Sequence, residues 1–180
     1  MDDHILGIRA ILATTPARWL DLAGTLAESE LTARPPQPGS WSAIECLRHL
    51  IESERLVFPV RLEAILEGRD FEAYDPDAAG DIADEPGTLS ELATLFAELR
   101  SESTKVVSGV SPEDLDRTAR HAELGVVSLR QLLNEWAGHD LMHTVQGERA
   151  LMQTFIAASG PWRPYFADHD AGLPGVPAGA

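Results

Sequence analysis

Residues 128–158 read SLRQLLNEWAGHDLMHTVQGERALMQTFIAA, and this stretch decides the fold. Ser128 followed by Gln131 is a capping box, which is typical of a helix N-terminus. Beyond the cap, apolar and small side chains recur every three or four residues, so the stretch predicts one long helix that ends before Ser159-Gly160-Pro161. One face of this helix carries the row that a bundle interior requires. The row is Leu132, Trp136, His139, His143, Gln146 and Ala150.

Helical spacing also predicts three earlier helices, at about residues 3–31, 41–67 and 89–108. Pro16 and Pro59 should bend the first and the second of them. Gly68 ends the second helix, and a second capping box, Thr88 with Glu91, starts the third. Ser111-Pro112 then begins a short helical turn. The prediction is an all-α fold, a four-helix bundle.

The connections between these helices contain no convincing strand. Residues 69–87, RDFEAYDPDAAGDIADEPG, are acidic and rich in turn residues, which predicts a long surface crossover between the second and third helices. Crossovers of this kind often cover a site. Residues 121–127, HAELGVV, could be extended, but one strand cannot make a sheet, so we expect a connector.

The length of 180 residues fits one domain, which we place at residues 1–166, followed by a tail at 167–180. Trp162, Tyr165 and Phe166 should pack back onto the bundle. The last ten residues, AGLPGVPAGA, have nothing to bury and are expected to be mobile.

Composition narrows the function. Apolar residues make up 44% of the chain and charged residues 24%, as in ordinary globular proteins. The formal charge of −15 repels phosphate backbones and anionic lipid headgroups, so nucleic acid and membrane surfaces are poor partners. Cys46 is the only cysteine, and no signal peptide or membrane span is evident. We therefore expect a cytoplasmic protein.

Three histidines carry the chemistry. His139 and His143 are four residues apart, which places both imidazoles on one helix face. His49 lies in an inward row of the second helix whose neighbours, such as Cys46 and Ser53, are small. Buried imidazoles without partners are costly, so three that converge call for a common partner. The sequence predicts that His49, His139 and His143 bind a divalent metal ion.

Other candidate residues have competing interpretations. Cys46 could be a fourth ligand, although a small buried hydrophobe is the better interpretation. Glu45, Glu54 and Gln146 could accept hydrogen bonds from ligand imidazoles or could be capping or solvated residues. Trp41 is expected to plug the bundle end. The remaining histidines at positions 4, 121 and 169 are expected at the surface.

A family resemblance becomes visible in two separated motifs. The first is Pro38-Gly39-Ser40-Trp41-Ser42, then Glu45, His49-Leu50 and Glu54. The second is Gly138-His139-Asp140, then His143 and Gln146. Together they resemble the signature of the DinB/YfiT-like superfamily, and the similarity spans roughly residues 5–166. It implies a bundle of up-down-down-up character.

The resemblance also implies a divalent ion held by one histidine of the second helix and two of the last, positions that match His49, His139 and His143. Zinc or nickel is expected first, iron or manganese next. Characterised relatives use such a site in thiol-dependent transfer. The expectation is a metal-dependent enzyme, a low-molecular-weight thiol transferase or a hydrolase, whose partners are a small thiol or an electrophile. The alternative is a non-enzymatic metal-binding or stress-response protein. Relatives often pair, so we expect a homodimer.

Overall fold

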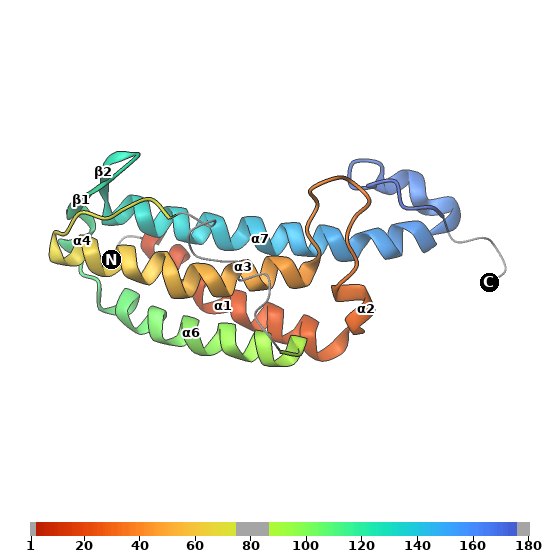
Figure 1. The fold of residues 1–180 in the computed structure, drawn as a ribbon, viewed down its shortest axis with the longest axis horizontal. Helices are drawn as coiled ribbons and strands as arrows, with labels where there is room; N and C mark the ends of the chain where they lie inside the picture. Colours follow the sequence, from red (N-terminus) through yellow and green to blue (C-terminus); the bar gives the residue numbers. More distant parts are fainter. Residues whose placement is uncertain (1–2, 75–86, 176–180) are drawn as a thin grey trace.

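A computed structural model describes residues 3–74 and 87–175 of the chain. The long helices of the described part run side by side (Figure 1). The α-helices are α1 (Asp3–Thr25), α2 (Glu28–Leu31), α3 (Ala43–Leu56), α4 (Phe58–Glu67), α6 (Leu89–Gly109) and α7 (Leu129–Ala158). Two short strands, β1 (Thr118–His121) and β2 (Gly125–Ser128), and two 3-10 segments, Asp114–Asp116 and Gly160–Phe166, complete the described part.

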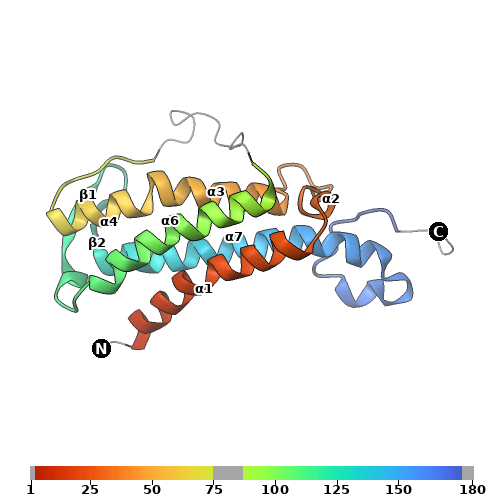
Figure 2. The ribbon, with the colours of Figure 1, turned by 90° about the horizontal axis from the view of Figure 1, so that it is seen from below.

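The bundle has the up-down-down-up topology that the resemblance implied. Helix α1 packs against α6 and α7, and α3 packs against the same two helices. Helices α3, α4 and α6 all run opposite to α1, and α7 returns parallel to α1 (Figures 1 and 2). Because α3 and α6 are parallel, the chain between them must travel back along the bundle. Most of that crossover, residues 75–86, lies outside the described residues.

Three of the predicted helix starts are confirmed by their caps. Ser42 caps α3, Thr88 caps α6 and Ser128 caps α7, each with a partner side chain three residues later. Gly68 ends α4 in the left-handed conformation, as expected.

The first two predicted helices are each divided in two. Helix α1 accommodates Pro16 and ends at Thr25, and Ala27 is extended before α2 begins. The prediction of one bent helix over residues 3–31 is therefore wrong in its last turns. The second helix breaks at Val57, just ahead of Pro59. Proline has no backbone N–H to continue the helical hydrogen bonds, which explains the break.

The predicted connector at residues 121–127 is wrong, because this region belongs to a hairpin. Strands β1 and β2 are antiparallel, with His121 opposite Gly125. The Nδ1 atom of His121 accepts hydrogen bonds from the backbone N–H groups of Glu123 and Leu124 and thereby closes the turn. Phe71, at the start of the crossover, adds a backbone bridge to His121. His121 is consequently buried rather than at the surface.

Two apolar clusters form the core, one toward each end of the bundle. The cluster near the hairpin includes Leu12, Phe58 and Trp136. The other includes Trp19, Leu47 and Phe96. The guanidinium group of Arg100 contacts the rings of both Phe96 and Trp136, so a buried charge lies where the two clusters meet.

The predicted packing of the C-terminal aromatic residues is wrong. Trp162 is 64% exposed and Tyr165 84% exposed. Polar contacts hold this region instead: Arg163 forms an ion pair with Asp170, and Gln153 of α7 bonds the backbone of His169 and Ala171. Phe166 is also exposed, at 37%.

No helix within residues 3–74 and 87–175 is both long and apolar enough to cross a bilayer.

Gly147 of α7 lies against the side chain of Trp19 in α1. A Cβ atom at this position would lie 2.7 Å from Cη2 of the buried Trp19 ring. Overpacking of this kind costs about 1–3 kcal/mol, against the ~1 kcal/mol that alanine gains over glycine within a helix. We expect Gly147→Ala to lower the free energy of unfolding by about 1 kcal/mol in urea denaturation.

Gly138 provides the control, because nothing lies within 4 Å of its added Cβ. Gly138→Ala should stabilise the protein by helix propensity alone. Equal effects of the two substitutions would show that the contact between α1 and α7 is not tight.

Candidate metal centre

The three predicted histidines come together from two helices. His49 lies in the middle of α3, and His139 and His143 lie one turn apart on α7. One nitrogen of each ring lies within 4.8 Å of the others. The ring centroids are 5.1 Å apart for His49 and His139, 4.5 Å for His49 and His143, and 4.4 Å for His139 and His143.

The spacing of these nitrogens fits a single small cation. The Nε2 atoms of His49 and His139 are 3.1 Å apart. Two nitrogens that each lie about 2.0–2.1 Å from a tetrahedral zinc ion are about 3.3 Å from each other. The donor set, three imidazoles and no carboxylate, is one that zinc and nickel accept.

Burial keeps the three rings neutral. It lowers the pKa of His139 to about 3 and that of His143 to about 4, and the nearby His49 would repel a proton on either ring. Burial also lowers the pKa of His49. At neutral pH each ring therefore has a free lone pair, the form in which histidine binds metals.

Two of the rings are oriented by acceptors on their outer side. Nδ1 of His143 lies 3.0 Å from Oε1 of Gln146, and Nδ1 of His49 lies 3.4 Å from Oε2 of Glu52. Acceptors at Nδ1 select the tautomer that leaves Nε2 free for a metal. The hydroxyl of Tyr74, in the crossover, donates to the other oxygen of Glu52.

His139 differs from the other two rings. Its Nδ1 atom is buried and has no hydrogen-bond partner among the described residues. Its Nε2 atom faces that of His49. A lone pair on each facing nitrogen would be unfavourable without a cation between them, so this arrangement also fits a metal ion.

Aromatic side chains enclose the three rings. Trp41 stacks on His143, with centroids 5.6 Å apart and planes at 15°, and also contacts His49. Phe58 contacts His139 edge-on at 5.1 Å. Trp41 therefore does more than plug the bundle end, because it forms a wall of the histidine cluster.

The open alternatives for the other sequence candidates now have structural answers. Glu45 caps α3 through Ser42 and pairs with Arg34, so it orients no ligand. Glu54 is buried, and its hydrogen-bond partners among the described residues are Arg100, Ser103 and the indole of Trp136, none of them in the histidine group. Gln146 does contact a ligand candidate.

Cys46 belongs to the apolar core, and it is not a member of the histidine group. Burial raises the pKa of its thiol to about 12. This position agrees with its interpretation as a small hydrophobe.

Sequence reasoning missed Glu52, Phe58 and Trp41 as neighbours of the site. Glu52 is three residues after His49, a spacing that places both on one helix face and could have indicated the contact. Nothing in the sequence could have placed Phe58, because its contact with His139 depends on the packing of α4 against α7.

Glu52 gives a direct test of ligand orientation. We expect Glu52→Ala to weaken zinc binding about tenfold or more, because the imidazole of His49 loses its acceptor. Glu52→Gln keeps an acceptor oxygen and should lose less zinc affinity. Competition against a chromophoric chelator measures the zinc dissociation constants of both variants. Glu72→Ala, which removes an exposed carboxylate of the crossover, is the control, and equal affinities for Glu72→Ala and Glu52→Ala would contradict the assignment.

Comparison with known proteins assigns the chain to a class. The DinB superfamily matches residues 11–146, about three quarters of the sequence. The chain belongs to the DinB superfamily. A search of curated protein sequences finds no match.

Two solved structures from Bacillus subtilis share the fold. YfiT, described as a probable metal-dependent hydrolase with an unusual four-helix bundle topology, is 18% identical with a TM-score of 0.73. The alignment covers 86% of this chain and 90% of YfiT. The DinB-like protein YjoA is 20% identical with a TM-score of 0.56, over 83% of this chain and 92% of its own.

Proposed function

We propose that this protein is a metal-dependent enzyme in which His49, His139 and His143 hold a divalent ion, zinc or nickel foremost. The observation that carries the proposal is the convergence of three neutral imidazoles on one point, two of them with outer acceptors. The description of YfiT as a probable metal-dependent hydrolase supports it.

Three protein ligands leave a coordination position for water or substrate, as in catalytic rather than structural zinc sites. A bound ion would supply Lewis acidity there and activate a water or a thiol for attack. The side chains around the site have separate roles. Gln146 and Glu52 fix the ring orientations, and Trp41 and Phe58 exclude bulk water.

The reaction is hydrolysis or transfer to a small thiol. The protein loaded with zinc or with nickel should accelerate one of them, assayed with activated esters and amides and with electrophiles plus glutathione, bacillithiol or mycothiol. His143→Ala should abolish the rate. A rate equal to that in buffer alone with every substrate and thiol tested, or an unchanged rate in His143→Ala, would contradict the proposal.

A non-enzymatic metal-binding role is the second candidate, and the burial of one ligand, His143, favours it. His143 is only 6% exposed, beneath Trp41. In that case the loaded protein should bind no added ligand at the metal. Cobalt substitution distinguishes the two candidates, because the visible spectrum of cobalt shifts when an external ligand such as acetohydroxamate enters its coordination sphere.

A further inference from the structure

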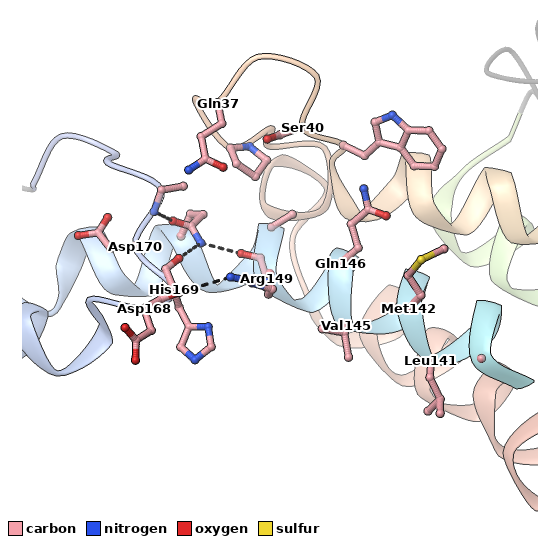
Figure 3. Close-up of a pocket in the computed structure, with 16 residues that line it drawn as sticks. Gln37, Ser40, Leu141, Met142, Val145, Gln146, Arg149, Asp168, His169 and Asp170 are labelled. Atoms are coloured by element: carbon pink, nitrogen blue, oxygen red, sulfur yellow. Dashed lines mark hydrogen bonds between the residues drawn. The ribbon is translucent and has the colours of Figure 1, made fainter.

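A groove of about 640 Å³ runs along the surface of α7 beside the histidine cluster. Figure 3 shows Met142, Gln146 and Arg149 along α7, with Gln37 and Ser40 on the loop beside them. Residues 168–171 close one end of it. The volume is typical of small-molecule sites.

Two residues join this groove to the histidine cluster. Trp41 lines the groove and stacks on His143. Gln146 lines the groove and lies 3.0 Å from Nδ1 of the same imidazole. A ligand at this end of the groove would therefore contact Trp41 and Gln146, which in turn contact the imidazole of His143.

The wall next to the histidines is apolar, and it is exposed. Leu141, Met142 and Val145 on α7 are 49%, 56% and 52% exposed. Together with Trp41 they offer a surface for a hydrocarbon chain rather than for a polar one.

Positive charge lies farther along the groove. Arg149 is the only lysine or arginine among the described lining residues, in a chain of formal charge −15. Within the described residues its guanidinium makes one hydrogen bond, 3.4 Å long, to the backbone oxygen of Asp168. Most of its donors are therefore available to a ligand.

The acidic groups at this end are partly neutralised. The carboxylate of Asp170 forms two hydrogen bonds with Arg163, 2.6 and 2.9 Å long. The contacts of Gln153 with the backbone of His169 and Ala171, 2.9 and 2.7 Å long, hold this end wall in place. Asp168 is the other acidic residue among the described residues that line the groove, and its carboxylate would oppose an anion.

We propose that the groove binds the substrate as a small organic acid, with its hydrocarbon chain along Met142 and Val145 and its carboxylate on Arg149. This inference rests on the proposed metal site and specifies its substrate class. Arg149 is six positions after His143 on α7, a rise of about 9 Å along the helix axis, and this rise sets the scale for the separation of the reacting group and the carboxylate. Arginine suits this role because its planar fork can bind a carboxylate through two hydrogen bonds.

A homologous series of probes tests both the charge and the distance. The monohydroxamates of succinic, adipic, suberic and sebacic acid each carry a metal-binding group and a carboxylate at increasing separation. Their affinities for the cobalt- or zinc-loaded protein are measured by titration, beside acetohydroxamate and the methyl ester of each acid. We expect the suberic compound to bind best, since its extended chain is about as long as six residues of helix. Its methyl ester should bind about fivefold or more weakly.

Variants assign the carboxylate preference to its residue. Arg149→Leu should remove the difference between acid and ester and leave acetohydroxamate binding unchanged. Asp168→Asn should have the opposite effect and raise the affinity for the acids, because it removes the opposing charge. Arg120→Leu, the same charge change on β1 at the far end of the bundle, should leave the whole series unchanged.

The outcomes separate this inference from the proposed function. If acetohydroxamate itself fails to bind the loaded protein, the open metal site is wrong and this inference falls with it. If acetohydroxamate binds but acids and esters are equal at every length, the metal site stands and the groove assignment is overturned. Sedimentation of Arg149→Leu gives a further check. A change in oligomeric state without a change in acid preference would show that a second copy of the chain covers the groove, which also overturns the assignment.

Discussion

Arg100→Leu should destabilise the protein by about 3–5 kcal/mol, the largest effect we expect from a single substitution. Arg100 is 2% exposed and bonds three groups from three other helical segments. Its Nε donates to Glu54 of α3 at 2.6 Å, its Nη2 donates to Asp140 of α7 at 2.9 Å, and its Nη1 donates to the backbone oxygen of Leu12 in α1 at 3.0 Å. Without the guanidinium, two buried carboxylates lose their counterion.

The partners of Arg100 sharpen this prediction. Glu54 also accepts hydrogen bonds from Ser103 and from the indole of Trp136, yet burial still raises the pKa of its carboxyl group. Neutral donors therefore do not replace the arginine. Arg100→Lys should be intermediate, because an ammonium group cannot reach both carboxylates in the same geometry. Adding Glu54→Gln and Asp140→Asn to Arg100→Leu should restore part of the loss, since no unpaired charge then remains buried.

Urea denaturation of these variants measures the effect, and Arg18→Leu is the matched control. The ion pair of Arg18 with Glu148 is exposed on both sides, so its loss should cost under about 1 kcal/mol. Soluble yield gives a second readout if Arg100→Leu does not fold. An Arg100→Leu protein as stable as Arg18→Leu would contradict the view that this charge cluster joins the four helices.

Zinc should raise the melting temperature by about 5–10 °C at a free concentration near one hundred times the dissociation constant. Such a concentration adds about 2.7 kcal/mol to stability, and a domain of this size gains about 2–4 °C per kcal/mol. The reason is the position of the ligands: His49 and His139 are 90 residues apart in sequence, so the site exists only in the folded bundle. A chelator should reverse the gain.

Melting temperatures of variants, measured with and without zinc, show where the stabilisation arises. His49→Ala, His139→Ala and His143→Ala should each lose most of the response to zinc. His4→Ala should keep it, because His4 lies near the start of α1 and contacts Asn134 instead. A full zinc response in His143→Ala would place the stabilising ion elsewhere.

The sequence predicted the helices and the histidine cluster because both depend on local patterns. Capping boxes at Ser42, Thr88 and Ser128 fix helix starts within one chain segment. The spacing of His139 and His143 fixes their common face. The small neighbours of His49 in its helical row indicated it as the third member, and the family motifs matched the same three positions. The helix starts and the common face of His139 and His143 need no knowledge of how the helices pack.

Features that depend on packing were beyond the sequence. The hairpin of β1 and β2 is completed by Phe71, which lies about fifty residues earlier in the chain. Thr118–His121 has no strong strand pattern of its own, so only the contact with Phe71 and the turn closed by His121 reveal it. The buried contact of Arg100 with Asp140 likewise reads, from sequence alone, as two ordinary charged residues on two helices.

Crystals grown with zinc and measured at the zinc absorption edge test the central claim most directly. The account predicts one strong anomalous peak per chain, about 2.0–2.1 Å from one nitrogen of each of His49, His139 and His143, with a further position open to solvent or ligand. A peak at any other residues, or three histidines that contact only one another in zinc-saturated crystals, would contradict it.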